Sequence, residues 1–160
     1  MAKKSKKRDA KVMAMDVHYM KAGYFKSDCC VYCGDVASDL DHVTPISLAY
    51  ALGVSVLEKE FDAEFLKVPS CSECNSKVLG AVNVCTVKGR KEIVLAYLEK
   101  EFIKYNTPKW TNDELGELGF TLASKIVPLQ DYKEALTRRI NWASAAVNIA
   151  WDNAKMGLIE

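Results

Sequence analysis

The clearest alternation of hydrophobic and polar positions lies in the second half of the chain, and its spacing is helical. Between residues 93 and 102, apolar side chains recur four positions apart, until Thr107 and Pro108 interrupt the pattern. Thr111 and Glu114 are spaced like the two partners of a capping box, which predicts that a second helix begins there. The apolar positions of this second helix are Leu115, Leu118 and Leu122.

A final helix is predicted to begin near Pro128, because proline is well tolerated in the first turn of a helix. The apolar stripe of this helix extends almost to Trp151. Its members are Leu129, Tyr132, Leu136, Ile140, Ala143 and Val147. Such a stripe has to be buried, either against the rest of this chain, which we favour, or against a second copy in a homodimer.

The first half of the chain has shorter elements and more turn signals. β-Branched residues near Val43 and Val68 indicate strands, and the Gly34-Asp35 pair indicates a tight turn. The patterns together predict an α+β protein that is mostly α-helical. Its expected parts are a disordered basic arm at residues 1–11, a helical segment at 12–28, a cysteine-rich module at 29–85 and a helical region at 86–160.

Length and composition restrict the class of protein. With 160 residues, of which 49% are hydrophobic and 27% charged, the chain can bury one ordinary core. No apolar run approaches the roughly 20 residues needed to cross a bilayer, and the charged N-terminus does not resemble a secretory signal. We therefore expect a soluble, cytoplasmic protein with no membrane partner.

The formal net charge of +1 hides an asymmetry along the chain. Six basic residues oppose only Asp9 in the first 11 positions, so this arm carries +5 and the remaining residues carry −4. The basic residues of the arm are Lys3, Lys4, Lys6, Lys7, Arg8 and Lys11. Binding of a polyanion would depend on this arm or on a local patch that includes Lys77, Lys88, Arg90 and Lys91. The alternative is that the arm only increases solubility.

Four of the six cysteines form two C-x-x-C pairs, Cys30 with Cys33 and Cys71 with Cys74. This spacing lets a tight turn direct two sulfur atoms at one tetrahedral ion, and two such pairs complete its coordination. The expected zinc ion is structural, because four protein ligands leave no open position for a substrate. The alternative is a pair of redox-active dithiols. Cys29 and Cys85 are expected to remain outside the ligand set as small core residues.

Between the two pairs lies Asp41-His42-Val43-Thr44-Pro45, and Asn75 follows Cys74 directly. The order C-x-x-C, Asp-His-x-x-Pro, then Val-Pro-Ser-C-x-x-C-Asn-x-Lys resembles the HNH nucleases, also called the ββα-metal family, and their phage or mobile-element members in particular. The resemblance covers about residues 30 to 80, roughly a third of the chain. It implies a ββα-metal core with a four-cysteine zinc knot, followed here by a helical C-terminal region.

The resemblance also implies roles for three residues. His42 would be the general base that activates water, which suits an imidazole with a reference pKa of about 6.5. Asp41 and Asn75 would bind one catalytic magnesium or manganese ion through oxygen, and that ion would stabilise the charge that develops on the phosphate. The implied reaction is hydrolysis of DNA that leaves 5′-phosphate and 3′-hydroxyl ends. Lys77, two residues after Asn75, is either a phosphate contact or a solvated helix lysine.

Two features depart from the family pattern. Many members have an asparagine about five residues before the third cysteine, and this position is Leu66 here. The stretch from residue 46 to residue 65 resembles an inserted helix. Two alternatives therefore stay open: a dimeric junction-resolving endonuclease with a similar core, and a zinc-stabilised nucleic-acid-binding module without catalysis.

Overall fold

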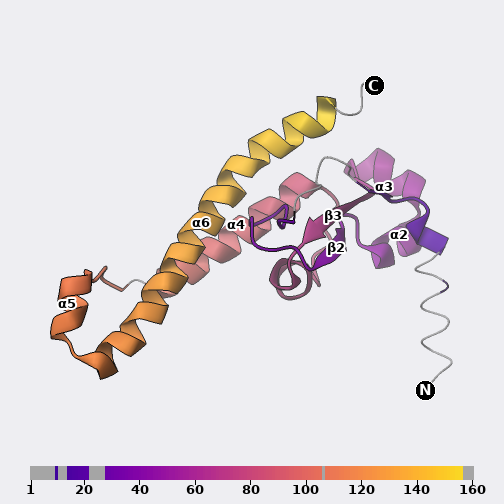
Figure 1. The fold of residues 1–160 in the computed structure, drawn as a ribbon. Helices are drawn as coiled ribbons and strands as arrows, with labels where there is room; N and C mark the ends of the chain where they lie inside the picture. The colour runs from indigo at the N-terminus through magenta and orange to yellow at the C-terminus, as the bar shows by residue number, and fades with distance from the viewer. Residues whose placement is uncertain (1–9, 11–13, 22–27, 106, 157–160) are drawn as a thin grey trace, which may run out of the picture.

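The computed structural model describes residues 10, 14–21, 28–105 and 107–156. Most of the basic arm, including Lys3, Lys4, Lys6, Lys7 and Arg8, lies outside the described residues. The described part is mostly helical, with a small sheet and a cluster of four cysteines. Figure 1 shows the sheet between a short helical pair on one side and two long helices on the other. The coarse prediction of a mostly helical α+β chain is confirmed.

The sheet has the strand order β1-β3-β2. β2 (Asp39–His42) and β3 (Leu66–Ser70) are antiparallel, with Asp41 opposite Val68 and His42 opposite Lys67. The strands predicted near Val43 and Val68 are therefore present. Leu66, which stands where the family has asparagine, belongs to β3, and its carbonyl accepts a hydrogen bond from the Val43 N–H at 3.0 Å.

β1 (Met20–Lys21) pairs in parallel with the start of β3. This strand differs from the expectation of a helical segment at residues 12–28, in which residues 14–16 are the helical ones among those that the structure describes. The difference arises from tertiary structure, because residues 20 and 21 form hydrogen bonds with the edge of β3. The weak helical tendency of the local sequence does not predict this pairing.

The stretch inserted between β2 and β3 forms two helices, α2 (Ile46–Leu52) and α3 (Val54–Phe61). Gly53 separates them with φ 83, a backbone conformation that favours glycine. Leu57 and Ala49 are buried with Tyr19 and Phe65 in a small second core. The insertion thus packs beside the segment that precedes the cysteines.

The C-terminal region contains α4 (Val87–Lys104), α5 (Asn112–Glu117) and α6 (Phe120–Met156). The capping box of Thr111 and Glu114 is confirmed, with both reciprocal hydrogen bonds present. Two boundaries differ from the prediction. Gly119, with φ 75, ends the helix that was expected to include Leu122, and Pro128 lies inside α6 and not at its start. Proline removes one backbone N–H donor from the helix, and the helix nevertheless continues on both sides of Pro128.

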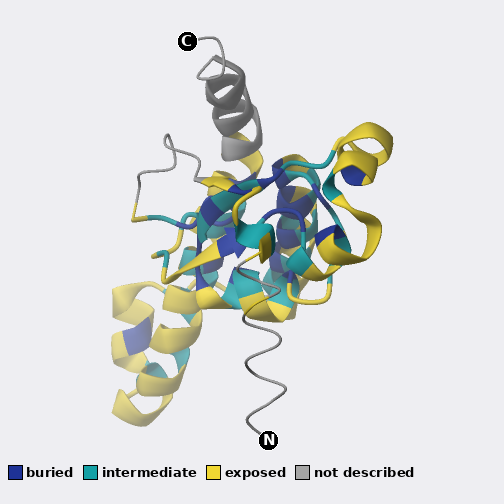
Figure 2. Cartoon of the chain, turned by 90° about the vertical axis from the view of Figure 1, so that its right-hand side faces the viewer, coloured by how far each residue is buried: buried dark blue, intermediate teal, exposed yellow. Residues whose placement is uncertain are grey.

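α6 lies along α4, and the two helices pack against each other over most of the length of α4 (Figure 1). Leu136 and Ala143 of α6 belong to the same buried core as Val94 and Leu98 of α4. The stripe is therefore buried within the chain at Leu136 and Ala143, whereas Leu129 is 39% exposed and Tyr132 is 36% exposed. Figure 2 shows that α5 and the beginning of α6 are mostly exposed, in contrast to the buried centre of the molecule. No helix among the described residues is long and apolar enough to cross a membrane.

Candidate functional site

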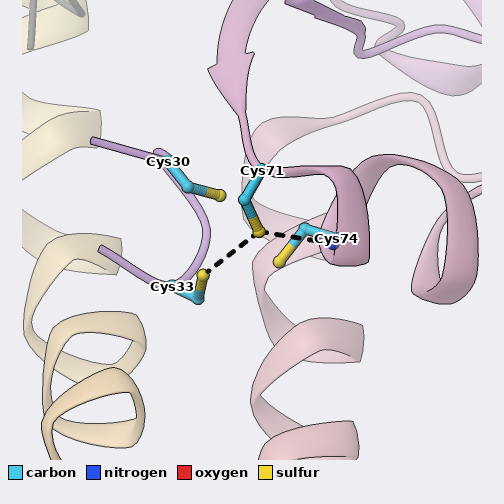
Figure 3. Close-up of side chains that lie close together, drawn as sticks. All are labelled: Cys30, Cys33, Cys71 and Cys74. Atoms are coloured by element: carbon cyan, nitrogen blue, oxygen red, sulfur yellow. Dashed lines mark hydrogen bonds between the residues drawn. The ribbon is translucent and has the colours of Figure 1, made fainter. Parts of the chain in front are cut away.

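The four paired cysteines come from two segments that the sheet brings together (Figure 3). Cys30 and Cys33 lie in a turn before β2, where Gly34 adopts φ 74 and donates its N–H to the Cys30 carbonyl at 2.9 Å. Cys71 directly follows β3, and Cys74 lies in η2 (Glu73–Val78). The Val31 N–H donates to the Pro69 carbonyl at 2.9 Å, so the turn is attached to β3 just before Cys71.

The geometry of the four sulfur atoms fits one tetrahedral metal ion. All four Sγ atoms lie within 4.8 Å of one another, and the Cys33 and Cys71 sulfurs are 3.7 Å apart. Zinc–sulfur bonds of about 2.3 Å place the corners of a tetrahedron about 3.8 Å apart. The side chains are buried, with relative exposures of 0% for Cys30, Cys33 and Cys74 and 6% for Cys71. These cysteines are thus placed to bind a metal such as zinc.

Among the described residues, no other group of three or more histidine, cysteine or acidic side chains is placed to hold a metal ion. Cys29 and Cys85 lie outside the cluster, as expected. Cys85 is buried, and its thiol donates to the Asn83 carbonyl. Cys29 is half-buried and forms a backbone bridge with Val36.

α6 contacts the turn that carries Cys30 and Cys33 directly. A Cβ atom at Gly34 would lie 2.6 Å from ring atoms of Trp142, so only glycine leaves room for this indole beside the turn. The Trp142 Nε1 donates to the Val31 carbonyl at 3.4 Å. The turn that carries Cys30 and Cys33 therefore packs on a helix more than 100 residues away in sequence, which the sequence analysis did not predict.

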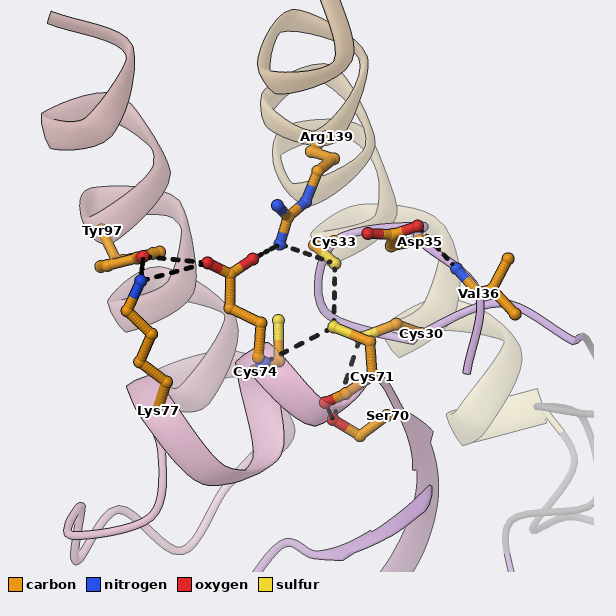
Figure 4. A network of polar contacts seen from close by, with 11 residues as sticks. Cys30, Cys33, Asp35, Val36, Ser70, Cys71, Cys74, Lys77, Tyr97 and Arg139 are labelled. Atoms are coloured by element: carbon orange, nitrogen blue, oxygen red, sulfur yellow. Dashed lines mark hydrogen bonds and ion pairs between the residues drawn. The ribbon is translucent and has the colours of Figure 1, made fainter. Parts of the chain in front are cut away.

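A polar network extends from the cluster (Figure 4). Arg139 of α6 lies 2.7 Å from a Glu73 carboxylate oxygen and 3.5 Å from the Cys33 sulfur. Glu73 also accepts a hydrogen bond from the Tyr97 hydroxyl at 3.0 Å. Its pKa is lowered, because the contacts with Arg139 and Tyr97 outweigh the opposing effect of partial burial. Lys77 completes the network by donating to the Tyr97 hydroxyl at 2.6 Å.

The side chain of Asp41 is buried and is engaged within the protein. Its Oδ2 accepts hydrogen bonds from the Tyr32 hydroxyl at 2.5 Å and from Arg90 Nη1 at 2.8 Å. Burial, and then the negative charge of Asp41, raise the pKa of Tyr32, so this phenol is a neutral donor. Arg90 also donates its Nε to the Val84 carbonyl at 2.9 Å. Asp41 therefore connects β2 to the first turn of α4.

The position of Arg90 corrects the expected basic patch. Arg90 is 2% exposed and Lys91 is 1% exposed, so neither side chain is accessible to a nucleic acid. Both lie on the face of α4 that packs against the module. Lys88 is exposed on the same helix and keeps its expected place on the surface. Lys77 is also exposed, although its ammonium is held by Tyr97 and Glu73.

Replacing Arg90 by methionine is expected to lower the free energy of unfolding by about 3 to 5 kcal/mol, because it leaves the buried Asp41 carboxylate without its cation. Urea unfolding of the metal-loaded protein, followed by circular dichroism, measures this change. Lys88→Met is the matched control, since it removes an exposed charge two residues earlier on α4. Equal unfolding midpoints for the two variants would contradict the structural role assigned to the ion pair.

His42 follows Asp41 at the end of β2, so its side chain leaves the opposite face of the strand. Its Nε2 lies 3.0 Å from Asp16 Oδ1, and its side chain is 26% exposed. Tyr19 packs edge-on against the imidazole, with ring centroids 4.7 Å apart. Lys67 donates to the other Asp16 oxygen at 2.5 Å. The hydrogen bonds from His42 and Lys67 lower the pKa of Asp16, which keeps this carboxylate ionised.

Asp16 was not among the residues predicted from the sequence. It lies 26 positions before His42, in a segment with only a weak helical pattern, and no local motif distinguishes it. Asn75 lies where it was expected, on η2 directly after Cys74, and its N–H donates to the Cys71 carbonyl at 2.9 Å. η2 contacts β2, so Asn75 and the Asp41-His42 pair are on neighbouring elements.

The resemblance to HNH nucleases rests on the sequence motifs given above. Comparisons of this chain with protein-family models, with curated proteins and with solved structures each found no match. The function is therefore argued from the residues of this chain alone.

Proposed function

We propose that this protein is a divalent-metal-dependent endonuclease of the HNH type, which hydrolyses DNA phosphodiester bonds with His42 as the general base. The observation that carries this proposal is the pairing of His42 with Asp16. A partly exposed imidazole held by an ionised carboxylate is the arrangement that orients a histidine for proton transfer. The ordered motifs around it, from Cys30 to Asn75, supply the resemblance to this class of enzyme.

The pairing also indicates which ring nitrogen would act. Asp16 is ionised and accepts a hydrogen bond, so it favours the tautomer of His42 that carries its proton on Nε2. Nδ1 then keeps a lone pair that is able to accept a proton from water. The T-shaped contact with Tyr19 restricts rotation of the ring.

The catalytic metal would be held by Asp41 and Asn75, whose oxygen atoms suit magnesium or manganese. Both contacts made by Asp41 involve Oδ2, so Oδ1 is the atom offered to such an ion. When bound, the ion would supply positive charge to the scissile phosphate and the leaving oxygen. Arg90 would then hold Asp41 in place through their ion pair and would not contact DNA.

DNA is the proposed partner, and its contacts would come from exposed cations. Lys88 is exposed on α4, and Lys77 is exposed next to Tyr97. The arm residues Lys3, Lys4, Lys6, Lys7 and Arg8 remain proposed contacts outside the described residues. Because residues beyond the arm carry a net negative charge, affinity for DNA should depend on the arm and fall steeply as salt is added.

Cleavage of supercoiled plasmid by the zinc-loaded protein tests the proposal. We expect nicked or linear products with added magnesium or manganese, and none when both ions are left out. A set of branched and linear duplexes of equal length should be included. Intact DNA in every case, from protein that keeps its structural metal and its cooperative unfolding, would contradict the nuclease proposal.

Replacing Asp16 by asparagine should slow metal-dependent cleavage by about 10-fold, because it removes the charge that aligns His42, whereas the base itself contributes roughly 10²–10⁴. Cleavage rates measured under single-turnover conditions test this effect. Asp39→Asn is the matched control, because it removes an exposed carboxylate from the strand that carries His42. A rate for Asp16→Asn that equals the rate of this control would remove Asp16 from the mechanism.

One observation favours a second candidate, a nucleic-acid-binding module without catalysis. Asp41 is engaged by the ion pair with Arg90 and by the hydrogen bond from Tyr32, contacts that would suffice for a residue with a structural role alone. In that case DNA binding would be retained without cleavage, and binding measured by fluorescence anisotropy would be unchanged by His42→Ala and insensitive to magnesium.

Exposed apolar residues near the start of α6 favour the junction-resolving alternative, which requires a homodimer. Phe120 is 89% exposed and Leu122 is 51% exposed, and Leu129 is partly exposed further along the helix. These residues precede the part of α6 that is buried on α4. Sedimentation equilibrium, together with preference for four-way over linear DNA, distinguishes this alternative from a monomeric duplex nuclease.

A further inference from the structure

Two cationic side chains each have a buried nitrogen without a hydrogen bond. Among the described residues, these nitrogens are Lys91 Nζ and Arg139 Nε. Lys91 is 1% exposed, and none of its hydrogen-bonding capacity is used. Burying an ammonium group without a neighbouring anion is strongly unfavourable. A nearby negative charge would remove this penalty.

Both cations belong to the surroundings of the four cysteines, although they come from different helices. Arg139 extends from α6 and places Nη2 3.5 Å from the Cys33 sulfur (Figure 4). Burial lowers the pKa of Lys91 on α4 to about 8, and a negative charge on Cys30 opposes this shift. One cation therefore accompanies a cysteine at each end of the first C-x-x-C pair.

A bound metal–thiolate centre would explain why two cations, Lys91 and Arg139, lie beside the four cysteines. Four thiolates and one divalent ion carry a net charge of −2, and all four sulfurs are buried. We infer that Lys91 and Arg139 are the charge partners of a divalent metal ion bound by Cys30, Cys33, Cys71 and Cys74 as four thiolates, and that they strengthen its binding. This inference concerns the metal centre alone and does not depend on nuclease activity.

The charges of the neighbouring groups are consistent with this assignment. Glu73 adds one negative charge beside the cluster and is paired with Arg139 at 2.7 Å. Lys77 contacts the same carboxylate at 3.5 Å from the solvent side. Three cations, Lys91, Arg139 and Lys77, thus balance the metal–thiolate centre and Glu73 together. Without the thiolate charge, the buried Lys91 would have no counterpart.

The assignment makes the metal a link between the module and the C-terminal helices. Arg139 and Trp142 lie nearly one turn apart on α6, and both contact the turn that carries Cys33. Loss of the metal, followed by protonation of the thiolates, would leave Lys91 buried without an anion and leave Arg139 with Glu73 as its anionic partner. The C-terminal region would then be fixed in place by the metal as well as by its apolar stripe.

The test is competition for cobalt(II) and zinc(II) between the full-length protein and a chromophoric chelator. The charge-transfer band of cobalt thiolates reports binding independently of any activity. Lys91→Met and Arg139→Gln should each weaken metal binding by about 10-fold to 100-fold, as is typical for residues that support metal ligands. Lys88→Met and Arg138→Gln are the matched controls, because each removes an exposed cation from the same helix.

Arg139→Lys distinguishes the effect of the positive charge on metal affinity from the effect of the side chain's shape. It keeps the positive charge, so its affinity should lie closer to that of the unmodified protein than to that of Arg139→Gln. Equal losses in Arg139→Lys and Arg139→Gln would overturn the inference, since shape and not charge would then determine binding. Lys91→Met that binds cobalt as tightly as Lys88→Met would overturn it as well.

Discussion

Removal of the structural metal is expected to abolish the cooperative unfolding transition of this protein. The four cysteines connect the turn before β2 to the end of β3, two segments about 40 residues apart. Zinc binding by four thiolates contributes about 10 to 16 kcal/mol in small zinc domains at neutral pH. Whole domains are stable by only about 5 to 15 kcal/mol, so loss of this contribution is comparable to the entire stability.

Thermal unfolding monitored by near-ultraviolet circular dichroism, with and without a strong zinc chelator, measures this effect. Metal analysis should give one ion per chain before chelation. Cys74→Ser should behave like the chelated protein, whereas Cys29→Ser should retain the ion, because Cys29 lies next to Cys30 but outside the cluster. A chelated protein that still unfolds cooperatively at an unchanged temperature would show that the apolar core suffices without metal.

The parts of the fold that could be predicted from the sequence are those that depend on neighbouring residues. The capping box of Thr111 and Glu114 uses groups three residues apart, and the structure contains it. The cluster of four cysteines was predictable for a related reason, because each C-x-x-C pair is local and one tetrahedral ion would need both pairs. The stripe that includes Leu136 and Ala143 was predictable from helical periodicity.

The parts that were missed depend on contacts between distant segments. β1 exists because Met20 and Lys21 pair with β3, 46 positions later by register, and the local pattern around them favours a helix. Arg90 and Lys91 read as surface cations in an isolated sequence. Arg90 is buried opposite Asp41, with which it forms an ion pair, and the thiolates of the cysteine cluster are the anions proposed for Lys91. A charged residue in a helix has no sequence signal that distinguishes a solvated position from a paired one.

The Asp-His motif combines a feature that the sequence predicts with contacts that it does not predict. The sequence identified Asp41 and His42 together, but strand geometry sends their side chains to opposite faces of β2. Asp41 faces Tyr32 and Arg90, whereas His42 faces Asp16 and Tyr19. The two residues therefore have different environments, and their roles need separate tests.

Replacing His42 by alanine is expected to reduce metal-dependent DNA cleavage by roughly 10² to 10⁴, the usual contribution of a general base. The substitution removes the imidazole that is held 3.0 Å from Asp16 and that the proposed mechanism uses to accept a proton from water. The rate constant for conversion of supercoiled to nicked plasmid, measured under single-turnover conditions, separates this effect from product release. Zinc content and unfolding temperature should remain close to those of the unmodified protein, because His42 is partly exposed and contacts no cysteine ligand.

His18→Ala is the matched control, since His18 is the other histidine of the chain and is exposed among the described residues. Its cleavage rate should equal that of the unmodified protein. If His42→Ala cleaves DNA as fast as His18→Ala, a different group activates the water, and the proposed mechanism is wrong even though the protein is a nuclease. A different outcome is that the unmodified protein and both variants bind DNA equally and cleave none of it. The buried ion pair of Asp41 with Arg90 would then explain why Asp41 holds no catalytic metal ion. It would then identify β2 as a structural strand of a nucleic-acid-binding module.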